Sequence, residues 1–247
     1  ESSYRMKREI HGWWSPRLEK NMEVVVYGQW GIPLLMFPTA GADFLEYERF
    51  QLIDSISWYI ETGKFKVFSI NSINNESWLN NSMQPHHKAL RHMTYNYYVI
   101  DEVVPFIHAN CNGLQPIYLT GASLGALHAA NIFFRRPDLF AGTIPMSGYY
   151  DLKSYTKGYY DENVYFNSPT DYLSNLGDEN LLNQMRHNKR IIIATGQGEY
   201  EAPEGSINLS NILRSKGIPH ELEIWGHDMT HDWPTWRRML PHFLGRL

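Results

Sequence analysis

The chain has 247 residues, of which 43% are hydrophobic, 14% aromatic and 19% charged. This length suits one domain with a large core, and we expect residues 1–247 to form a single domain. With 26 acidic and 22 basic residues, the formal net charge is -4. That balance excludes the basic footprint of a nucleic-acid-binding protein, so we expect no nucleic-acid partner.

Cysteine usage and hydropathy predict the compartment. Cys111 is the single cysteine, so no internal disulfide can form. No apolar run approaches the length of a membrane span, and the first residues, ESSYRMKREIHGWW, lack the apolar core of a signal peptide. We expect a cytoplasmic protein without membrane association. The sequence leaves open whether it is a monomer or a homo-oligomer.

Short apolar segments alternate with longer segments of helical period, which is typical of a parallel sheet with helices on both faces. Strands are expected at residues 22–28, 32–37, 64–70, 115–120, 141–147, 190–195 and 220–226. Helices are expected at about residues 46–62, 86–109, 123–136, 203–216 and 232–245. The pattern predicts the α/β class with a mostly parallel central sheet flanked by helices.

Residues 150–188 interrupt this alternation. The segment is polar, rich in Tyr and Asn, and too long for a simple loop. It falls between the fifth and sixth expected strands. We interpret it as an insertion or small lid with short helices, covering the carboxyl ends of the strands, where open α/β sheets bind ligands.

The segment Gly121-Ala122-Ser123-Leu124-Gly125 fits the pattern G-x-S-x-G. The pattern alone is common, but here an apolar strand precedes it and a helix follows, which is the context of a nucleophilic serine. The glycines leave room for a strained turn that exposes the Ser123 hydroxyl. The Leu124 N–H and the positive end of the helix would then stabilise an oxyanion. The alternative is a serine that only caps the helix.

A serine nucleophile needs a general base, normally a histidine from a later loop. GHDMTHDWPTW, after the last expected strand, contains His227 and His231. His227 directly follows the strand glycine, close to the sheet, so we favour His231. A competing interpretation is a metal site that uses both histidines with Asp228 and Asp232. No third cluster of ligands converges in the sequence, and we expect no metal.

The histidine in turn needs a carboxylate. Glu199 lies three residues beyond Gly196, in the loop after the strand at 190–195, and is the expected acid. Glu201 is the nearest rival. Asp151 is a third candidate, because some enzymes of this architecture take their acid from the position after the preceding strand.

Several longer segments carry a resemblance to a known family: SPRLEKNMEVVVYG, LMFPTAGADFLEYE, SINNESW, GASLGALHAANIFFRRPDLF and GHDMTHDWPTWRRMLP. With them the chain resembles, over nearly its whole length, the putative esterase family of the α/β-hydrolase superfamily, the group of esterase D, feruloyl esterases and mycolyltransferases. The resemblance implies an α/β-hydrolase fold and a serine hydrolase that acts on carboxylic esters without a cofactor. In the last segment, the histidine followed by Asp-Trp and a second Trp is similar to the family's catalytic histidine segment, which carries over to His231.

The resemblance also implies that the loop PTAGA completes the oxyanion hole. Pro38 has no N–H, so Thr39 or Ala40 is the expected donor. The chain departs from the family here, since relatives commonly have His-Gly after this strand. It also has Glu199 where relatives commonly have Asp.

We therefore expect His231 to activate Ser123 for attack on a small carboxylic ester, with an acyl-enzyme intermediate. Trp78, Tyr150 and Tyr160 are the expected substrate-binding residues, drawn from a wider aromatic set that also holds Tyr149, Tyr159, Tyr165 and Phe166. These rings would otherwise pack the insertion down. Acyl transfer, thioester or amide cleavage and a catalytically silent binding module are the alternative functions.

Overall fold

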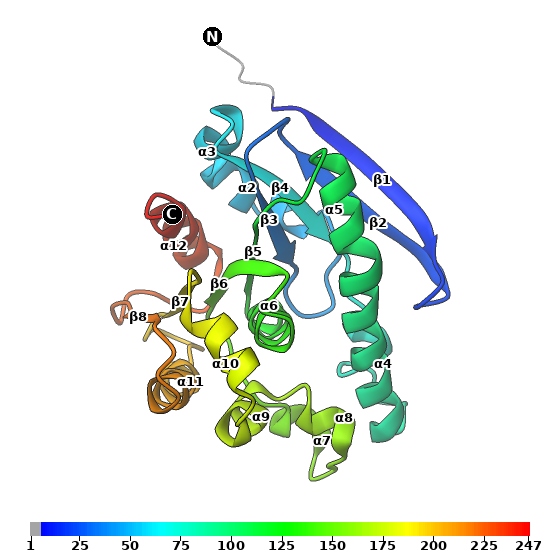
Figure 1. Ribbon diagram of the computed structural model, residues 1–247, viewed down its shortest axis with the longest axis vertical. Helices are drawn as coiled ribbons and strands as arrows, with labels where there is room; N and C mark the ends of the chain where they lie inside the picture. Colours follow the sequence, from blue (N-terminus) through cyan, green and yellow to red (C-terminus); the bar gives the residue numbers. More distant parts are fainter. Residues whose placement is uncertain (1–5) are drawn as a thin grey trace.

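The computed structural model describes residues 6–247, which are built around one eight-stranded sheet (Figure 1). The strands are β1 (Arg8–Ser15), β2 (Lys20–Tyr27), β3 (Ile32–Phe37), β4 (Phe65–Ile70), β5 (Ile117–Ala122), β6 (Phe140–Met146), β7 (Arg190–Thr195) and β8 (Glu221–Ile224). Their order across the sheet is β1-β2-β4-β3-β5-β6-β7-β8. β2 pairs antiparallel with β1 and β4, and the remaining pairs are parallel. The predicted α/β class with a mostly parallel sheet is confirmed.

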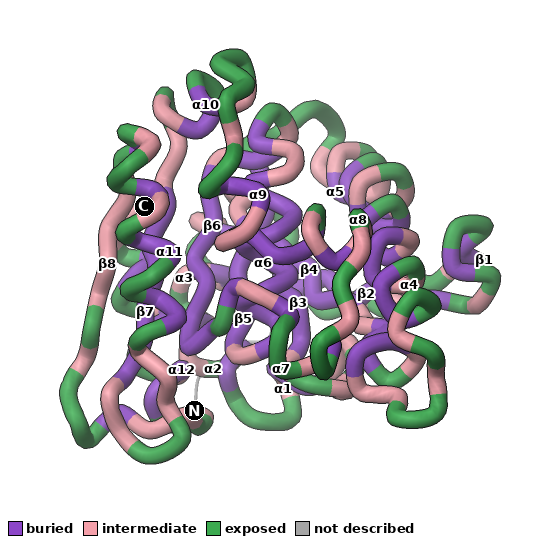
Figure 2. The backbone as a smooth tube through the Cα atoms, turned by 90° about the horizontal axis from the view of Figure 1, so that it is seen from below, coloured by how far each residue is buried: buried purple, intermediate pink, exposed green. Residues whose placement is uncertain are grey.

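Burial explains why the sequence pattern revealed seven strands and missed β1. The inner strands read as continuous apolar runs because helices cover both faces, and Figure 2 shows them buried in the centre of the molecule. β1 is an edge strand whose residues alternate between exposed and half-buried. Trp14 is 60% exposed. Such a strand needs no apolar run, because its pairing with β2 comes from backbone hydrogen bonds.

The helices lie between the strands or after the last one in the chain, and they cover both faces of the sheet. They are α1 (Glu46–Arg49), α2 (Leu52–Ser55), α3 (Ser57–Glu61), α4 (Pro85–Tyr98), α5 (Val104–Asn110), α6 (Leu124–Arg135), α7 (Lys153–Thr156), α8 (Glu162–Tyr165), α9 (Pro169–Asn175), α10 (Glu179–Arg186), α11 (Pro203–Ser215) and α12 (Trp233–Leu244), with a short 3-10 helix η1 (Asn74–Glu76) and a π-helix η2 (Val99–Val103). Helices α7 to α10 fall within the predicted insertion at 150–188.

Two of the expected helices are irregular for local reasons. The helix expected at 46–62 is three short helices, and Gln51, with a left-handed φ of 59°, separates the first two. The helix expected at 86–109 contains the π-helix η2, which ends two residues before Pro105. Proline has no N–H and its ring crowds the carbonyl four residues back, which a wider π turn accommodates.

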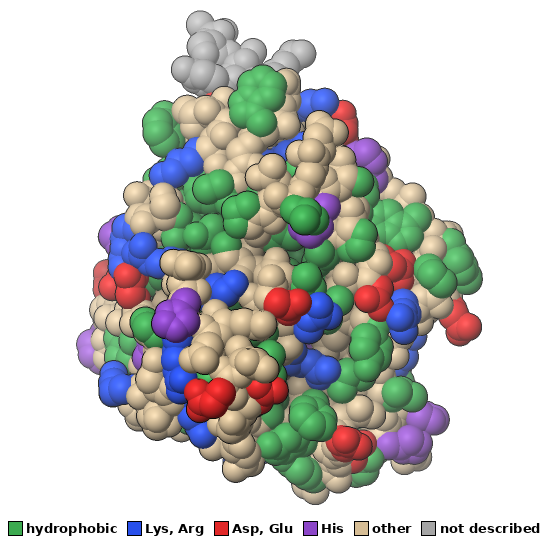
Figure 3. All heavy atoms as spheres, in the orientation of Figure 1, with side chains coloured by type: hydrophobic (Ala, Val, Ile, Leu, Met, Phe, Trp, Pro, Cys, Tyr) green, Lys and Arg blue, Asp and Glu red, His purple; other side chains and the backbone are tan. Residues whose placement is uncertain are grey.

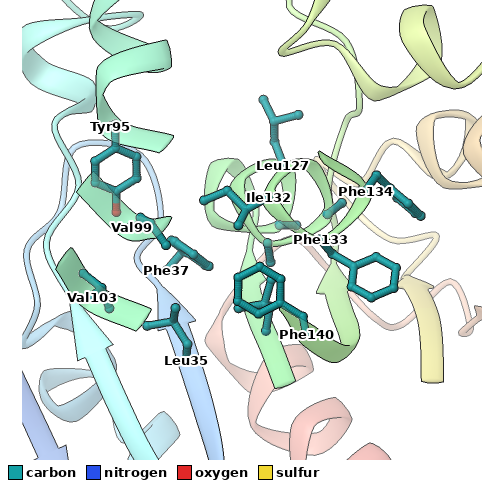
Figure 4. Packing of buried hydrophobic residues seen from close by; sticks show 14 of the residues in the cluster. Leu35, Phe37, Tyr95, Val99, Val103, Leu127, Ile132, Phe133, Phe134 and Phe140 are labelled. Carbon is teal, nitrogen blue, oxygen red and sulfur yellow. The ribbon is translucent and has the colours of Figure 1, made fainter. Parts of the chain in front are cut away.

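The core has one apolar layer on each face of the sheet. One layer packs α4, α5, α6 and α11 against the strands, and the other packs α2, α3 and α12. Figure 4 shows Tyr95, Val99 and Val103 pointing toward Leu35 and Phe37 of β3. These two layers hold the carboxyl ends of β3, β5 and β6 in fixed relative positions.

The surface carries both signs of charge. On the face seen in Figure 3, acidic and basic side chains are interspersed. Within residues 6–247, none of the helices combines the length and the apolar character needed to cross a membrane.

Candidate active site

Ser123 lies in a tight turn between β5, which ends at Ala122, and α6, which begins at Leu124. Its φ and ψ are 59° and -121°, a conformation that L-residues rarely adopt. The flanking glycines allow it. A Cβ on Gly121 would collide with the backbone of Gly125, and a Cβ on Gly125 would collide with the carbonyl of Phe37. The turn therefore brings Ser123 to the end of β5 and packs α6 directly against the end of β3.

Tyr47 holds the ends of these two strands together. Its hydroxyl donates a hydrogen bond to the Phe37 carbonyl and accepts one from the Ala122 N–H at 3.0 Å. The side chain is fully buried, and burial raises the pKa of the Tyr47 hydroxyl, so it stays protonated and able to donate. Ala122 is the residue before Ser123, so this bridge fixes the base of the serine turn.

His231 lies beside Ser123, although 108 positions separate them in the chain. Its Nε2 is 3.0 Å from Ser123 Oγ, and its Nδ1 is 2.9 Å from Glu201 Oε1. The ring meets Trp236 edge-on, with ring centroids 5.2 Å apart. Trp236 is buried and donates from Nε1 to Ser147 Oγ at 2.9 Å. The imidazole is thus fixed by contacts on three sides and faces the serine.

Glu201 is a buried carboxylate with several donors around it. Its Oε2 accepts from the Gly196 N–H at 2.9 Å and from Thr195 Oγ1 at 3.0 Å. Burial opposes ionisation, but the hydrogen bonds from His231, the Gly196 N–H and Ser147 outweigh it, so the pKa of Glu201 lies below its ordinary value. An ionised carboxylate at this place orients the Nδ1–H of His231 and stabilises its protonated form.

The structure contradicts the prediction of Glu199 as the acid, because the carboxylate that contacts His231 is that of Glu201. Glu199 is exposed, and it meets His231 through its backbone carbonyl, which accepts from the His231 N–H at 3.0 Å. The loop turns back after it, through Tyr200 with φ 65° and a bond from Glu201 N–H to Gly198 O at 3.1 Å. This reversal directs the side chain of Glu201 inward.

Neither Asp151, the third candidate acid, nor His227, the alternative base, is part of this set of hydrogen bonds. Asp151 Oδ1 accepts from the Lys153 N–H at 2.9 Å, at the start of α7. His227 is exposed on the loop after β8. Within residues 6–247, no three His, Cys, Asp or Glu side chains are grouped so that they could hold a metal ion.

Three residues were expected to supply the backbone N–H groups of an oxyanion hole: Leu124, Thr39 and Ala40. For the N–H of Leu124 and that of Ala40, no acceptor is found within residues 6–247. Thr39, the other expected donor, is occupied: its N–H donates to Glu46 Oε1 at 2.8 Å and its hydroxyl to Oε2 at 2.6 Å. Of the two loop residues, Ala40 is thus the better donor.

A pocket of about 120 Å³ opens beside Ser123 and His231. It is lined by Ser123, Leu124, Leu127, Ser147, Gly148, Tyr149, Ser154, Tyr155, Tyr200, Ala202 and His231. Ser154 and Tyr155 belong to α7, so the segment 150–188 contributes to the site. Figure 4 shows Leu127 pointing away from Ile132 and Phe133, which face the core.

The three aromatic residues chosen from the sequence are not in this pocket. Trp78 is 3% exposed and donates from Nε1 to His92 Nδ1, behind Tyr155. Tyr150 is fully buried, and the hydroxyl of the exposed Tyr160 donates to Asp171. Rings that fill the core and rings that line a site look alike in a sequence. Nothing in the sequence therefore distinguished Tyr155 and Tyr200, which do line the pocket, from tyrosines of the core.

The "Putative esterase" family model matches residues 52–247. The chain belongs to the putative esterase family. This membership confirms the resemblance seen in the sequence and makes the protein a carboxylic ester hydrolase.

Solved structures show the same fold for this esterase. A ferulic acid esterase matches with a TM-score of 0.77 at 18% identity, covering 98% of this chain and 99% of the other. An S-formylglutathione hydrolase from Staphylococcus aureus matches with a TM-score of 0.71 at 15% identity, over 98% and 99% of the two chains. MPT51 of Mycobacterium tuberculosis matches with a TM-score of 0.72 at 15% identity, over 97% of each. No curated protein matches by sequence. The fold is that of the α/β-hydrolase esterases.

Proposed function

We propose that this esterase hydrolyses small carboxylic esters through an acyl-enzyme on Ser123, with His231 as general base and Glu201 as its acid partner. The observation that carries the proposal is the continuous set of hydrogen bonds from Ser123 Oγ through both nitrogens of His231 to the buried Glu201 carboxylate. This arrangement is the one that raises the nucleophilicity of a serine hydroxyl at neutral pH.

The reaction has two halves. In the first, His231 Nε2 takes the proton of Ser123 Oγ as the oxygen attacks the ester carbonyl carbon, and a tetrahedral oxyanion forms. The protonated His231 then gives this proton to the alcohol oxygen, the bond from that oxygen to the carbonyl carbon breaks, and the alcohol leaves. In the second half, His231 takes a proton from water. The hydroxide attacks the acyl carbon, the bond from Ser123 Oγ to that carbon breaks, and protonated His231 returns its proton to Ser123 Oγ as the acid is released.

The oxyanion is assigned to the N–H groups of Leu124 and Ala40, which have no other acceptor within residues 6–247. Leu124 lies at the first turn of α6, where the helix dipole adds positive potential. Each such donor contributes on the order of 3 kcal/mol to transition-state stabilisation.

The size of the pocket supports a small substrate. Sites for drug-sized ligands typically enclose about 300–1,000 Å³, whereas the volume beside Ser123 is about 120 Å³. Tyr149, Tyr155 and Tyr200 border it. We therefore expect acetyl and butyryl esters to be turned over faster than esters with long acyl chains.

Substitution of the nucleophile tests the proposal. Ser123→Ala should lower kcat on p-nitrophenyl acetate by about a thousandfold or more, because it removes the hydroxyl that is hydrogen-bonded to His231. Ser154→Ala, which removes a second serine hydroxyl from the same pocket, should change kcat less than about fivefold. Circular dichroism of both variants checks that they are folded. Wild-type turnover by Ser123→Ala would place the nucleophile elsewhere.

A further inference from the structure

A buried asparagine forms a hydrogen bond to the backbone of the loop that carries Ala40. Asn74, in η1, donates from Nδ2 to the Ala40 carbonyl at 2.7 Å and is 1% exposed. Ala40 has a left-handed φ of 37°, which is uncommon for a residue with a side chain. A backbone in this conformation persists only where its surroundings hold it. Asn74 is therefore a candidate for the group that holds the Ala40 peptide.

Asn74 is itself held by a histidine from the nucleophile helix. The Nε2 of His128, in α6, is 2.9 Å from Asn74 Oδ1. His128 is buried, and its ring lies edge-on to that of His92 in α4, with centroids 4.8 Å apart. Trp78 Nε1 donates to His92 Nδ1 at 2.9 Å. Side chains from α4, α6 and the loop after β4 thus meet beneath the Ala40 loop.

The hydrogen-bond directions in this group are mutually consistent. Trp78 can only donate, so His92 Nδ1 is an acceptor and its proton is on Nε2. Asn74 donates to Ala40 through Nδ2, so its Oδ1 accepts from a proton on His128 Nε2. His92, with an unprotonated Nδ1, is then neutral. Burial lowers the pKa of each, that of His128 to about 4, which agrees with neutral rings at neutral pH.

Two buried ring nitrogens in this group have no partner within residues 6–247: His92 Nε2 and His128 Nδ1. By the tautomers above, the first is a donor and the second an acceptor, on adjacent rings. The printed bonds form two segments, one from Trp78 to His92 and one from His128 through Asn74 to the Ala40 carbonyl, and the two rings meet edge-on where the segments adjoin.

We propose that Asn74 and His128 are positioning residues that fix the Ala40 peptide, so that its N–H is in place when the oxyanion forms. This inference rests on the proposed function, because it assigns a role to the oxyanion loop. Neither residue lines the pocket. Their loss should therefore act on the transition state and leave substrate binding largely unchanged.

The alternative is that this polar group only stabilises the fold, and a matched buried asparagine separates the two. Asn131, which lies in α6 like His128, is fully buried, and its Nδ2 donates to Asn167 Oδ1 at 2.9 Å. Its contacts are with Asn167 and Tyr172 of the insertion. Asn74→Ala and Asn131→Ala each remove a buried amide, but only the first releases the Ala40 carbonyl.

The expected result is a split between the two variants. Asn74→Ala should lower kcat on p-nitrophenyl acetate by about tenfold to hundredfold with KM within about twofold of wild type. Its affinity for a trifluoromethyl ketone, which forms a tetrahedral oxyanion with the serine, should fall in parallel. Asn131→Ala should lower the Tm and keep kcat within about twofold. An Asn74→Ala enzyme with wild-type kcat, or an equal loss of kcat in both variants, overturns the inference.

His128 provides a second pair of variants in case Asn74→Ala fails to fold. His128→Phe keeps a buried ring but removes the donor to Asn74, and should lower kcat as Asn74→Ala does. His128→Gln retains an amide donor and should recover at least part of that loss. Wild-type kcat in His128→Phe overturns the inference. Turnover by Ser123→Ala would instead refute the proposed function itself, so the two failures are distinguishable.

Discussion

Glu199 and Glu201 are two positions apart in one loop, yet their carboxylates have different surroundings. Glu201 is buried and bonded to His231, to the Gly196 N–H and to Thr195. Glu199 is exposed and meets His231 through its backbone carbonyl. A carboxylate that orients the imidazole must contact it directly, so the two residues should respond differently to the same substitution.

Glu201→Gln should lower kcat on short-chain esters by about a thousandfold or more, because the amide cannot stabilise protonated His231 and permits the wrong tautomer. Glu199→Gln, in the same loop, should stay within about twofold of wild type. Initial-rate kinetics on both purified variants measure the difference. If Glu199→Gln shows the large loss and Glu201→Gln does not, the acid has been misassigned.

The serine and histidine could be predicted from the sequence because each is tied to a recognisable strand end. Ser123 follows β5 within a glycine-flanked pattern, and His231 belongs to the segment between the last strand and the last helix. Glu199 was chosen over Glu201 because the sequence does not reveal the reversal at Tyr200. The roles of Ser123 and His231 stay predictions until the variants are measured.

At the scale of elements, the bridge by Tyr47 connects the loop after β3 with the serine turn after β5. Tyr47→Phe would leave the buried Ala122 N–H without its acceptor. An unsatisfied buried N–H costs about 1–3 kcal/mol, so the free energy of unfolding should fall by that amount. We also expect kcat to fall severalfold, because the hydroxyl that hydrogen-bonds both Phe37, before the oxyanion loop, and Ala122, before the nucleophile, is lost. Urea denaturation and steady-state kinetics measure the two effects.

Tyr59→Phe is the matched control for this prediction. The Tyr59 hydroxyl donates to the Pro241 carbonyl at 3.0 Å, at the far end of α12 from His231. Its loss should lower stability without changing kcat. If both variants leave kcat unchanged, the Tyr47 bridge serves stability alone.

The strands of the sheet were predictable wherever burial on both faces makes an apolar run. β3 and β7 match their expected bounds, while β1 was missed because its polar, alternating residues lie at an open edge. The break at Gln51 was not predictable, because a left-handed residue inside a helical pattern depends on tertiary contacts. Tyr149 belonged to the wider aromatic set, but Tyr155 and Tyr200 were missed for a related reason: a sequence does not show which neighbouring tyrosine faces the site.

At the scale of the whole molecule, the buried histidines predict sensitivity to acid. Burial lowers the pKa of His92 and His128 in the folded state, that of His128 to about 4, whereas an unfolded histidine has a pKa of about 6.5. Between these values the unfolded chain binds more protons, so stability is complete above about pH 6.5 and declines as the pH falls toward 4. Each histidine contributes a slope of up to about 1.4 kcal/mol per pH unit.

Urea denaturation at a series of pH values between 7 and 4.5 measures this slope. In His128→Phe one of the two titrating groups is gone, so the decline should be shallower than in the wild type. Glu201, whose pKa is also lowered, adds a further loss below about pH 4.5 and does not affect the comparison above it. Equal slopes in the two proteins would mean that His128 does not titrate as its burial requires.

Labelling with a fluorophosphonate, followed by peptide mass spectrometry, tests most directly whether Ser123 is the activated nucleophile. We expect one phosphonyl group per chain, on Ser123 Oγ, with loss of ester turnover in proportion to labelling. His231→Ala and Glu201→Gln should label far more slowly, and Ser123→Ala not at all. An adduct on another residue, or full ester turnover by enzyme labelled on Ser123, would contradict the assignment.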